Sequence, residues 1–309
     1  MQPLFVTSGD MQADRRYEFA CQFWKRGDLE AAADIMTQAL ERAPDFASAW
    51  FSLGEIRDAL GDRDGAVAAF RRARDCDAAD PHGATLHLMR LGAEPMGEMP
   101  PAYVRTLFDQ YAPEFNSALL NVLNYRGPRV VRDAVLAALK DIGREPRFRR
   151  AIDLGCGTGL AARGFDRYVG EMIGCDISAG MIEEARKTGL YDRLEVCDME
   201  AMLHAEDAES ADLIFSADAL VYLGELGPLF QQVVRVLAPG GLFAFTVETH
   251  KGEDVILGEG LRYAHAAAWL RQRLAQAGLD VLSLAEVSTR DESGAPVPGL
   301  VAVAQSRAI

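Results

Sequence analysis

The amino-acid sequence predicts an α/β fold that is preceded by an all-helical region. Short apolar runs alternate with segments of helical character, and these runs lie at 151–153, 172–176, 193–198, 211–216 and 243–248. Such alternation is typical of strands joined by crossover helices in a mainly parallel sheet. Upstream, residues 13–46 match residues 47–80 at a period of 34. A repeat of this length is typical of stacked helical hairpins.

The first apolar run leads into a loop with glycine at every second position. The residues at 151–159 read Ala-Ile-Asp-Leu-Gly-Cys-Gly-Thr-Gly. Glycine lacks a Cβ atom, so the loop can turn sharply and let a ligand approach the backbone. Open α/β sheets bind nucleotides at the carboxyl ends of their strands. We therefore expect a ligand to be surrounded by Asp153, Gly155, Cys156 and Gly157.

The spacing of the glycines separates two classes of nucleotide. A dinucleotide-binding loop has the pattern G-x-G-x-x-G, but Leu160 stands at the third glycine position here. Asp153 would also repel a pyrophosphate. S-adenosylmethionine has no phosphate, and a carboxylate beside its sulfonium and ammonium groups is favourable. The loop therefore predicts S-adenosylmethionine as the cofactor.

Later strand ends supply further side chains for this cofactor. Asp176 ends the second strand, 23 residues after Asp153, where a carboxylate can accept hydrogen bonds from both ribose hydroxyls. Asp198 follows the third strand and can accept a hydrogen bond from the adenine amino group. Met199 is expected against the adenine ring. The remaining predicted contacts lie beside strand ends, at Ile177 and Ser216.

The motifs together resemble those of the class I S-adenosylmethionine-dependent methyltransferases. The matching segments are DLGCGTG at 153–159, GCDIS at 174–178, CDME at 197–200 and LAPGG at 237–241. The resemblance implies a Rossmann-like sheet of seven strands in the order 3-2-1-4-5-7-6, with the last strand antiparallel. Other expected elements are a helix end and turn at 237–241, a helix at 263–277, and final strands at 281–287 and 300–304.

The 34-residue repeat is close to the tetratricopeptide pattern of two helices per repeat. The second repeat contains Trp50-x-x-Leu53-Gly54 and then Ala66-x-x-x-Phe70-x-x-Ala73. The pattern departs from the family at Arg16 and Arg57. Because two repeats alone bury little surface, we expect a helix near 81–91 to cap them. A plain helical bundle is the alternative. Repeats of this kind usually present a groove to a protein partner, but they could also steady the catalytic domain or a dimer.

Proline and glycine near residues 92–101 mark a linker. We therefore expect a repeat region at 1–92, a linker at 93–100 and a methyltransferase domain at 101–309 with N-terminal lid helices at 101–140. The segment at 108–116 is similar to the FDxYAxxFD segment of methyltransferases that act on small molecules, although Asn116 replaces the final acid. The resemblance implies that Tyr111 and Phe115 fold over the cofactor. The whole combination resembles a family of predicted repeat-containing bacterial methyltransferases.

Composition fits an enzyme of the cytoplasm. The chain has 309 residues, of which 49% are hydrophobic, with no apolar run long enough for a membrane span and no signal-peptide pattern at the start. Five cysteines without C-x-x-C spacing indicate reduced thiols, and the five histidines show no metal-ligand spacing. The net charge of −14 disfavours nucleic acid as a substrate. No membrane or metal partner is expected, and the sequence leaves the oligomeric state open.

The methyl acceptor should approach above the fourth and fifth strands. Residues 216–222 lack the Asn/Asp-Pro-Pro-aromatic motif of enzymes that methylate nucleobase or amide nitrogen. The candidate acceptor-facing side chains are Tyr222, Glu248, His250, Tyr263, His265 and Arg290. Among them, His250, Tyr263 and His265 are the predicted catalytic residues, because they lie just beyond the fifth strand.

Three functions remain open from the sequence. The leading one is methyl transfer to a small molecule, free or carrier-bound, at oxygen, carbon or an amine. The second is methylation of a protein that the repeats recruit. The third is a scaffold that binds the cofactor without turnover.

Overall fold

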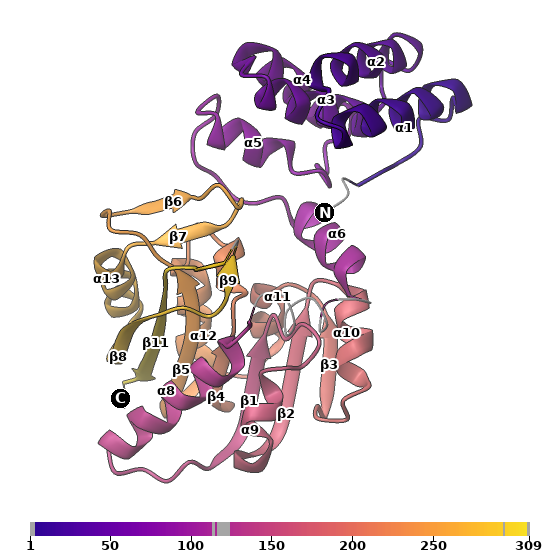
Figure 1. The fold of residues 1–309 in the computed structure, drawn as a ribbon. Helices are drawn as coiled ribbons and strands as arrows, with labels where there is room; N and C mark the ends of the chain where they lie inside the picture. The colour runs from indigo at the N-terminus through magenta and orange to yellow at the C-terminus, as the bar shows by residue number, and fades with distance from the viewer. Residues whose placement is uncertain (1–3, 113–114, 116–123, 293, 308–309) are drawn as a thin grey trace. The chain divides into compact units, whose positions relative to one another are not determined.

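The computed structural model describes residues 4–112, 115, 124–292 and 294–307. The chain divides into two compact units, Met1–Thr106 and Leu107–Ile309 (Figure 1). Helix α6, Pro101–Tyr111, runs through the boundary between them. Among the described residues, no helix is both long and apolar enough to cross a membrane.

The first unit is built from helices that pair in sequence order. They are α1 (Met11–Lys25), α2 (Leu29–Arg42), α3 (Ala47–Ala59), α4 (Arg63–Cys76) and α5 (Ala84–Arg90). Helix α1 packs on α2, and α3 packs on α4, as the 34-residue repeat predicts. Gly54 permits the second pairing, because a Cβ atom there would lie 2.6 Å from the Phe70 ring. The expected helix near 81–91 is present as α5, which packs on α4.

The turns between the paired helices repeat with the same period of 34 residues. Gly27 and Gly61, 34 residues apart, both have positive φ angles, of 83° and 77°. The next residue in each case is an aspartate that caps the following helix: Asp28 accepts the backbone N–H of Ala31, and Asp62 accepts that of Gly65. A left-handed glycine followed by a capping aspartate ends one helix and begins the next.

The second unit is centred on a mixed sheet with strand order β3-β2-β1-β4-β5-β11-β8. In sequence terms this is the predicted order 3-2-1-4-5-7-6. The strands are β1 (Phe148–Leu154), β2 (Val169–Asp176), β3 (Arg193–Val196), β4 (Ala211–Ser216), β5 (Leu237–Glu248), β8 (Leu279–Val287) and β11 (Gly299–Ser306). Strand β11 is antiparallel to both β5 and β8, which confirms the expectation for the last strand.

Helices cover both faces of this sheet. On one face, α8 (Gly127–Asp141) and α9 (Ala162–Phe165) pack through side chains such as Val135 and Phe165. On the other face, α11 (Met199–Ala205), α12 (Gly227–Val236) and α13 (Ala267–Ala277) pack through side chains such as Phe230 and Leu270. Helix α10, Ala179–Arg186, follows β2. In β1, Ala151 belongs to one core and Ile152 and Leu154 belong to the other, so the strand is buried on both faces.

Two sequence-based expectations about elements are wrong. Residues 263–265 form strand β7 (Tyr263–His265) instead of the first turn of a helix, because they pair with β5 and with β6 (Val255–Leu257). The turn expected at 237–241 is instead the start of β5, although α12 does end there, with Leu237 as its C-cap. The connector between β8 and β11 also contains a small antiparallel pair, β9 (Asp291–Glu292) and β10 (Ala295–Pro296).

Candidate active site

In the glycine loop after β1, the position with the closest neighbours is Gly155, and only glycine fits there. Gly155 has φ +67°, and a Cβ atom there would lie 2.4 Å from Cβ of Ala219 and 2.9 Å from Cε of Met199. The segments that follow β3 and β4 therefore contact the loop directly. Gly157 and Gly159 also have positive φ angles, of 53° and 85°. These conformations are the ones that glycine adopts without strain.

Asp176 is held at this loop by two backbone hydrogen bonds. Its Oδ2 accepts the N–H of Gly157 at 2.9 Å, and its Oδ1 accepts the N–H of Ser178 at 2.9 Å. The N–H of Cys156 donates to the carbonyl of Cys175 at 2.8 Å, which fixes the loop on β2. Burial raises the pKa of Asp176 to about 6, although the two backbone donors oppose that shift. The side chain predicted to bind ribose thus lies directly against the glycine loop.

Asp153 pairs with a residue that the sequence did not single out. The hydroxyl of Tyr191 donates to Asp153 Oδ2 at 2.8 Å, and the Tyr191 ring lies over Gly174, where a Cβ atom would be 2.7 Å away. Asp153 is 1% exposed. Burial raises its pKa to about 7, against the effect of the Tyr191 hydrogen bond. Within the described part of the chain, Asp153 Oδ1 is buried and has no hydrogen-bond partner.

The segment before the sheet is anchored beside Asp176. The Ser178 hydroxyl donates to Oδ1 of Asp109 at 2.6 Å, and the N–H of Gly180 donates to the same oxygen at 3.2 Å. Ser178 also caps α10 by accepting the N–H of Met181. Asp109 belongs to the segment that resembles a lid, so this aspartate fixes that segment to the element that follows β2.

One aromatic side chain of the same segment reaches the glycine loop. A Cβ atom on Gly157 would lie 3.8 Å from Phe115. The Phe115 ring packs edge-on against Phe108 and Tyr111, with centroids 6.0 and 6.5 Å apart. Phe108 in turn lies 5.3 Å from Tyr222, which follows β4. Phe108 therefore joins Tyr111 and Phe115 in this aromatic group, whereas Asn116 lies outside the described residues.

The other residues predicted to bind the cofactor have local structural partners. Oδ1 of Asp198 accepts the N–H of Ala201 at 2.7 Å and caps α11, and the Asp198 side chain is exposed. Ile177 is half-buried next to Asp176. The Ser216 hydroxyl is fully buried and donates to the carbonyl of Leu154 at 2.8 Å, so it joins β4 to β1.

The residues predicted to be catalytic are either buried or bound to nearby backbone groups. Tyr263 and His265 are 0% exposed in β7. His265 Nε2 contacts the carbonyl of Leu223 at 3.0 Å, and burial lowers the pKa of His265 to about 4. His250 Nδ1 accepts the N–H of Gly252 at 3.0 Å, and its Nε2 contacts the carbonyl of Asp254 at 2.9 Å. These contacts fold the loop between β5 and β6.

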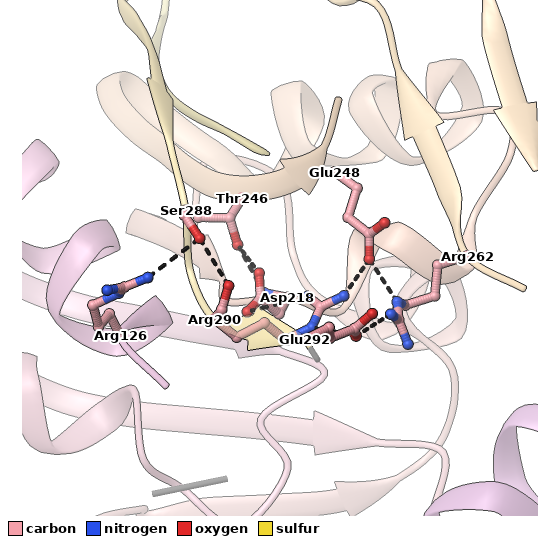
Figure 2. Close-up of polar contacts among 8 residues, drawn as sticks. All are labelled: Arg126, Asp218, Thr246, Glu248, Arg262, Ser288, Arg290 and Glu292. Atoms are coloured by element: carbon pink, nitrogen blue, oxygen red, sulfur yellow. Dashed lines mark hydrogen bonds and ion pairs between the residues drawn. The ribbon is translucent and has the colours of Figure 1, made fainter. Parts of the chain in front are cut away.

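A polar network occupies the carboxyl ends of β4 and β5 (Figure 2). Arg290, which is 5% exposed, donates to Glu248 and to Glu292 and lies 4.0 Å from Asp218. Arg262 donates to Glu248 at 2.5 Å and also to Glu292. Two acceptor-facing candidates, Glu248 and Arg290, are therefore brought together here. The network joins residues as far apart along the chain as Asp218 and Arg290, so their spacing gave no signal.

Comparisons with known proteins agree with this geometry. Residues 152–245 match the methyltransferase domain family, and residues 17–81 match the tetratricopeptide repeat family. Human methyltransferase-like protein 27 is 33% identical over 178 residues, which cover 56% of this chain and 66% of that protein. The malonyl-[acyl-carrier protein] O-methyltransferase of Salmonella typhimurium is 35% identical over 114 residues, which cover 37% of this chain and 43% of that protein. The chain thus spans less than two thirds of the length of each relative.

A solved structure shows the same fold. The 1,6-didemethyltoxoflavin-N1-methyltransferase of Burkholderia thailandensis, determined with S-adenosylhomocysteine, superposes with a TM-score of 0.54 at 16% identity. The match covers 69% of this chain and 92% of that one. The strand order, the glycine loop and the family matches lead to one assignment. The chain combines a segment that matches tetratricopeptide repeats with a segment that matches a methyltransferase domain, and its second unit has a methyltransferase fold.

Proposed function

We propose that this protein transfers the methyl group of S-adenosylmethionine to a small molecule, either free or attached to a carrier. The observation that supports this most directly is the position of Asp176. Its carboxylate bridges the glycine loop and the start of α10, and the aromatic group of Phe108, Tyr111 and Phe115 lies beside the same loop. This arrangement suits a ligand that has a ribose and an aromatic base.

The described residues fit this cofactor. Each oxygen of the Asp176 carboxylate accepts one backbone N–H and has a second lone pair for a ribose hydroxyl. Cε of Met199 lies close to Gly155, which supports a contact of Met199 with the adenine ring, and Asp198 is the residue before it. The unpaired Oδ1 of Asp153 can attract the cationic part of the ligand. When bound, the cofactor supplies a sulfonium methyl group that needs no further activation.

The contribution of the protein is then to position two reactants and to exclude water. Phe115 lies against the glycine loop and packs on Phe108 and Tyr111, and Asp109 holds their segment against Ser178. Holding the acceptor in line with the methyl group converts a bimolecular step into an effectively unimolecular one. The surroundings of His265 and Tyr263 favour structural roles for both residues, since neither side chain is exposed.

Incubation of the full-length protein with isotope-labelled S-adenosylmethionine and a cell extract tests this proposal. We expect label in the small-molecule fraction or on an acyl-carrier fraction. Label on other proteins would instead support recruitment of a protein substrate by the repeats, which is the second candidate because residues 17–81 match the tetratricopeptide family. Binding of S-adenosylhomocysteine without any transfer of label would support the scaffold function.

We also propose the division into repeats at 1–92, a linker at 93–100 and a catalytic domain at 101–309. A fragment that begins near Pro100 keeps Asp109, the aromatic group and the glycine loop. Calorimetry should therefore show that it binds S-adenosylhomocysteine as tightly as the full-length chain. A fragment that is folded by circular dichroism but does not bind would show that the repeats contribute to the cofactor site.

A further inference from the structure

Charged side chains converge beside the glycine loop, where the methyl acceptor has to lie under the proposed function. Asp218 follows β4, Glu248 ends β5, and Arg290 follows β8 (Figure 2). Arg262 precedes β7, and Glu292 lies in β9. We call these five residues the acceptor network. It adjoins the cofactor site because Ala219, the residue after Asp218, contacts Gly155.

The arginines of the acceptor network are already paired. Both Arg290 and Arg262 donate to Glu248 and to Glu292, and Arg290 also lies 4.0 Å from Asp218. Three carboxylates face two guanidinium groups, so the network carries one excess negative charge when its acids are ionised. A carboxylate acceptor would have to displace Glu248 or Glu292 and would face their repulsion. The network instead favours a neutral or cationic acceptor.

Asp218 is held in an unusual backbone conformation by Thr246. Its φ angle is +56°, in the left-handed region that few residues other than glycine adopt. The N–H of Asp218 donates to Thr246 Oγ1 at 2.8 Å, and the Thr246 hydroxyl donates to Asp218 Oδ1 at 2.8 Å. This pair of hydrogen bonds leaves the buried Oδ2 without a hydrogen bond, and Nη1 of Arg290 lies 4.0 Å from it. Strain of this kind is concentrated at functional sites.

The pKa of Tyr125 is affected by Asp218, Asp153 and Arg290. Burial raises the pKa of Tyr125 well above its ordinary value, and the carboxylates of Asp218 and Asp153 raise it further, while Arg290 lowers it. Asp218 itself is faced by Arg290, Thr246, Thr289, Glu248 and Tyr125, and burial is the main cause that raises its pKa.

We infer that the acceptor is an amine or a hydroxyl compound and not a carboxylate, and that Asp218 Oδ2 accepts the proton that this acceptor loses. The inference rests on the proposed methyl transfer. For an ammonium acceptor, Asp218 takes one N–H proton, the freed nitrogen lone pair forms the N–C bond, and the S–C electron pair stays on the sulfur. For a hydroxyl acceptor, the proton moves to Asp218 as the O–C bond forms. In both cases the products are a methylated acceptor and a neutral thioether.

Alkaline lability of the product distinguishes these acceptor classes. The full-length protein is incubated with methyl-labelled S-adenosylmethionine and either malonyl-[acyl-carrier protein] or a metabolite extract. Methyl esters release volatile methanol in base, whereas N-methyl and O-methyl ether products keep the label. We expect base-stable label from the extract and none on the malonyl probe. Retention of the product on a cation exchanger then separates an amine product from an ether.

Asp218→Asn tests the proton acceptor, and Asp207→Asn is the matched control. Asparagine tolerates the left-handed backbone as well as aspartate, so the change removes the carboxylate and keeps the conformation. We expect the Asp218 variant to lose roughly 100-fold or more in kcat and to keep its affinity for S-adenosylhomocysteine. The wild-type rate should fall as acid protonates Asp218, and this acid limb should be absent in the variant. Asp207 is exposed and lies before the other end of β4, so its variant should behave as wild type.

Base-labile label, methylation of the malonyl probe, or an Asp218→Asn variant with the wild-type rate would each overturn the inference. The product class is measured on the wild-type protein, so this part of the test does not depend on the folding of a variant. Binding of S-adenosylhomocysteine with no transfer in any arm would instead overturn the proposed function, and this inference would fall with it.

Discussion

Asp176→Asn should separate the stability of the free protein from its affinity for the cofactor. Burial raises the pKa of Asp176 from 3.8 to about 6. This shift means that the ionised carboxylate destabilises the folded state by about 3 kcal/mol above pH 6. The amide is uncharged and relieves this cost. It also places an N–H donor opposite the N–H of Gly157, and the lost hydrogen bond costs roughly 1–3 kcal/mol. The two effects are of similar size and oppose each other.

The sign of the pH dependence follows from the raised pKa. The folded state binds a proton more tightly than the unfolded state, so wild-type stability falls as the pH rises from 3.8 towards 6, whereas the Asn variant lacks this loss. Relative to wild type, the variant should therefore gain about 2 kcal/mol in free energy of unfolding between pH 4.5 and pH 7.5. Urea denaturation at the two pH values measures this difference, and Asp207→Asn serves as the control.

Affinity should respond in the opposite way. Loss of a charged acceptor for the ribose hydroxyls should weaken binding of S-adenosylhomocysteine by roughly 10- to 150-fold, which corresponds to about 1.5–3 kcal/mol. Isothermal titration calorimetry at pH 7.5 measures the change. Unaltered affinity in a folded variant would refute the placement of the cofactor at Asp176. A stability difference that is the same at both pH values would refute the assignment of the raised pKa to this carboxylate.

Three further substitutions test other parts of the site. Gly155→Ala should abolish binding of S-adenosylhomocysteine in calorimetry, because the new Cβ would lie 2.4 Å from Cβ of Ala219 and φ is +67°; retained binding would contradict the rigid loop. Tyr191→Phe should lower the free energy of unfolding by roughly 1–3 kcal/mol at pH 7.5 and by less at pH 5, where Asp153 is protonated. His265→Phe should destabilise the protein by about 1–3 kcal/mol in urea and leave S-adenosylhomocysteine affinity unchanged, since it only removes the contact to a carbonyl.

The sequence predicted the features that depend on consecutive strands or on the repeat period. The glycine loop and Asp176 lie at the ends of consecutive parallel strands, so their meeting follows from topology alone. The helical repeats were predictable because the period fixes both the packing residues and the turn chemistry, as Gly27 and Gly61 show. In each case the neighbouring residues along the chain determine the geometry.

The parts that it missed depend on contacts between distant segments. Tyr191 reaches Asp153 across 38 positions, and no spacing rule links a tyrosine before the third strand to the end of the first. Residues 263–265 have a helix-compatible composition, but pairing with β5 and β6 overrides that local preference. This pairing buries His265, which contacts a backbone carbonyl. From the sequence alone, a histidine just beyond the fifth strand suggested catalysis, because the pairing could not be foreseen.

Three buried aspartates lie at one edge of the sheet, and each of them costs folding free energy when it is ionised. Asp153, Asp176 and Asp218 all follow or end strands at the carboxyl edge, and burial is the main cause that raises the pKa of each. Apolar residues at these positions would stabilise the free protein, since no buried charge would have to be accommodated. Buried charges that destabilise the free protein are expected at sites where a bound ligand interacts with them favourably. Under the proposed function, Asp153 and Asp176 lie beside the cofactor, and Asp218 belongs to the acceptor network. A ligand on either side should therefore stabilise the protein, because it lowers the cost of the charge next to it.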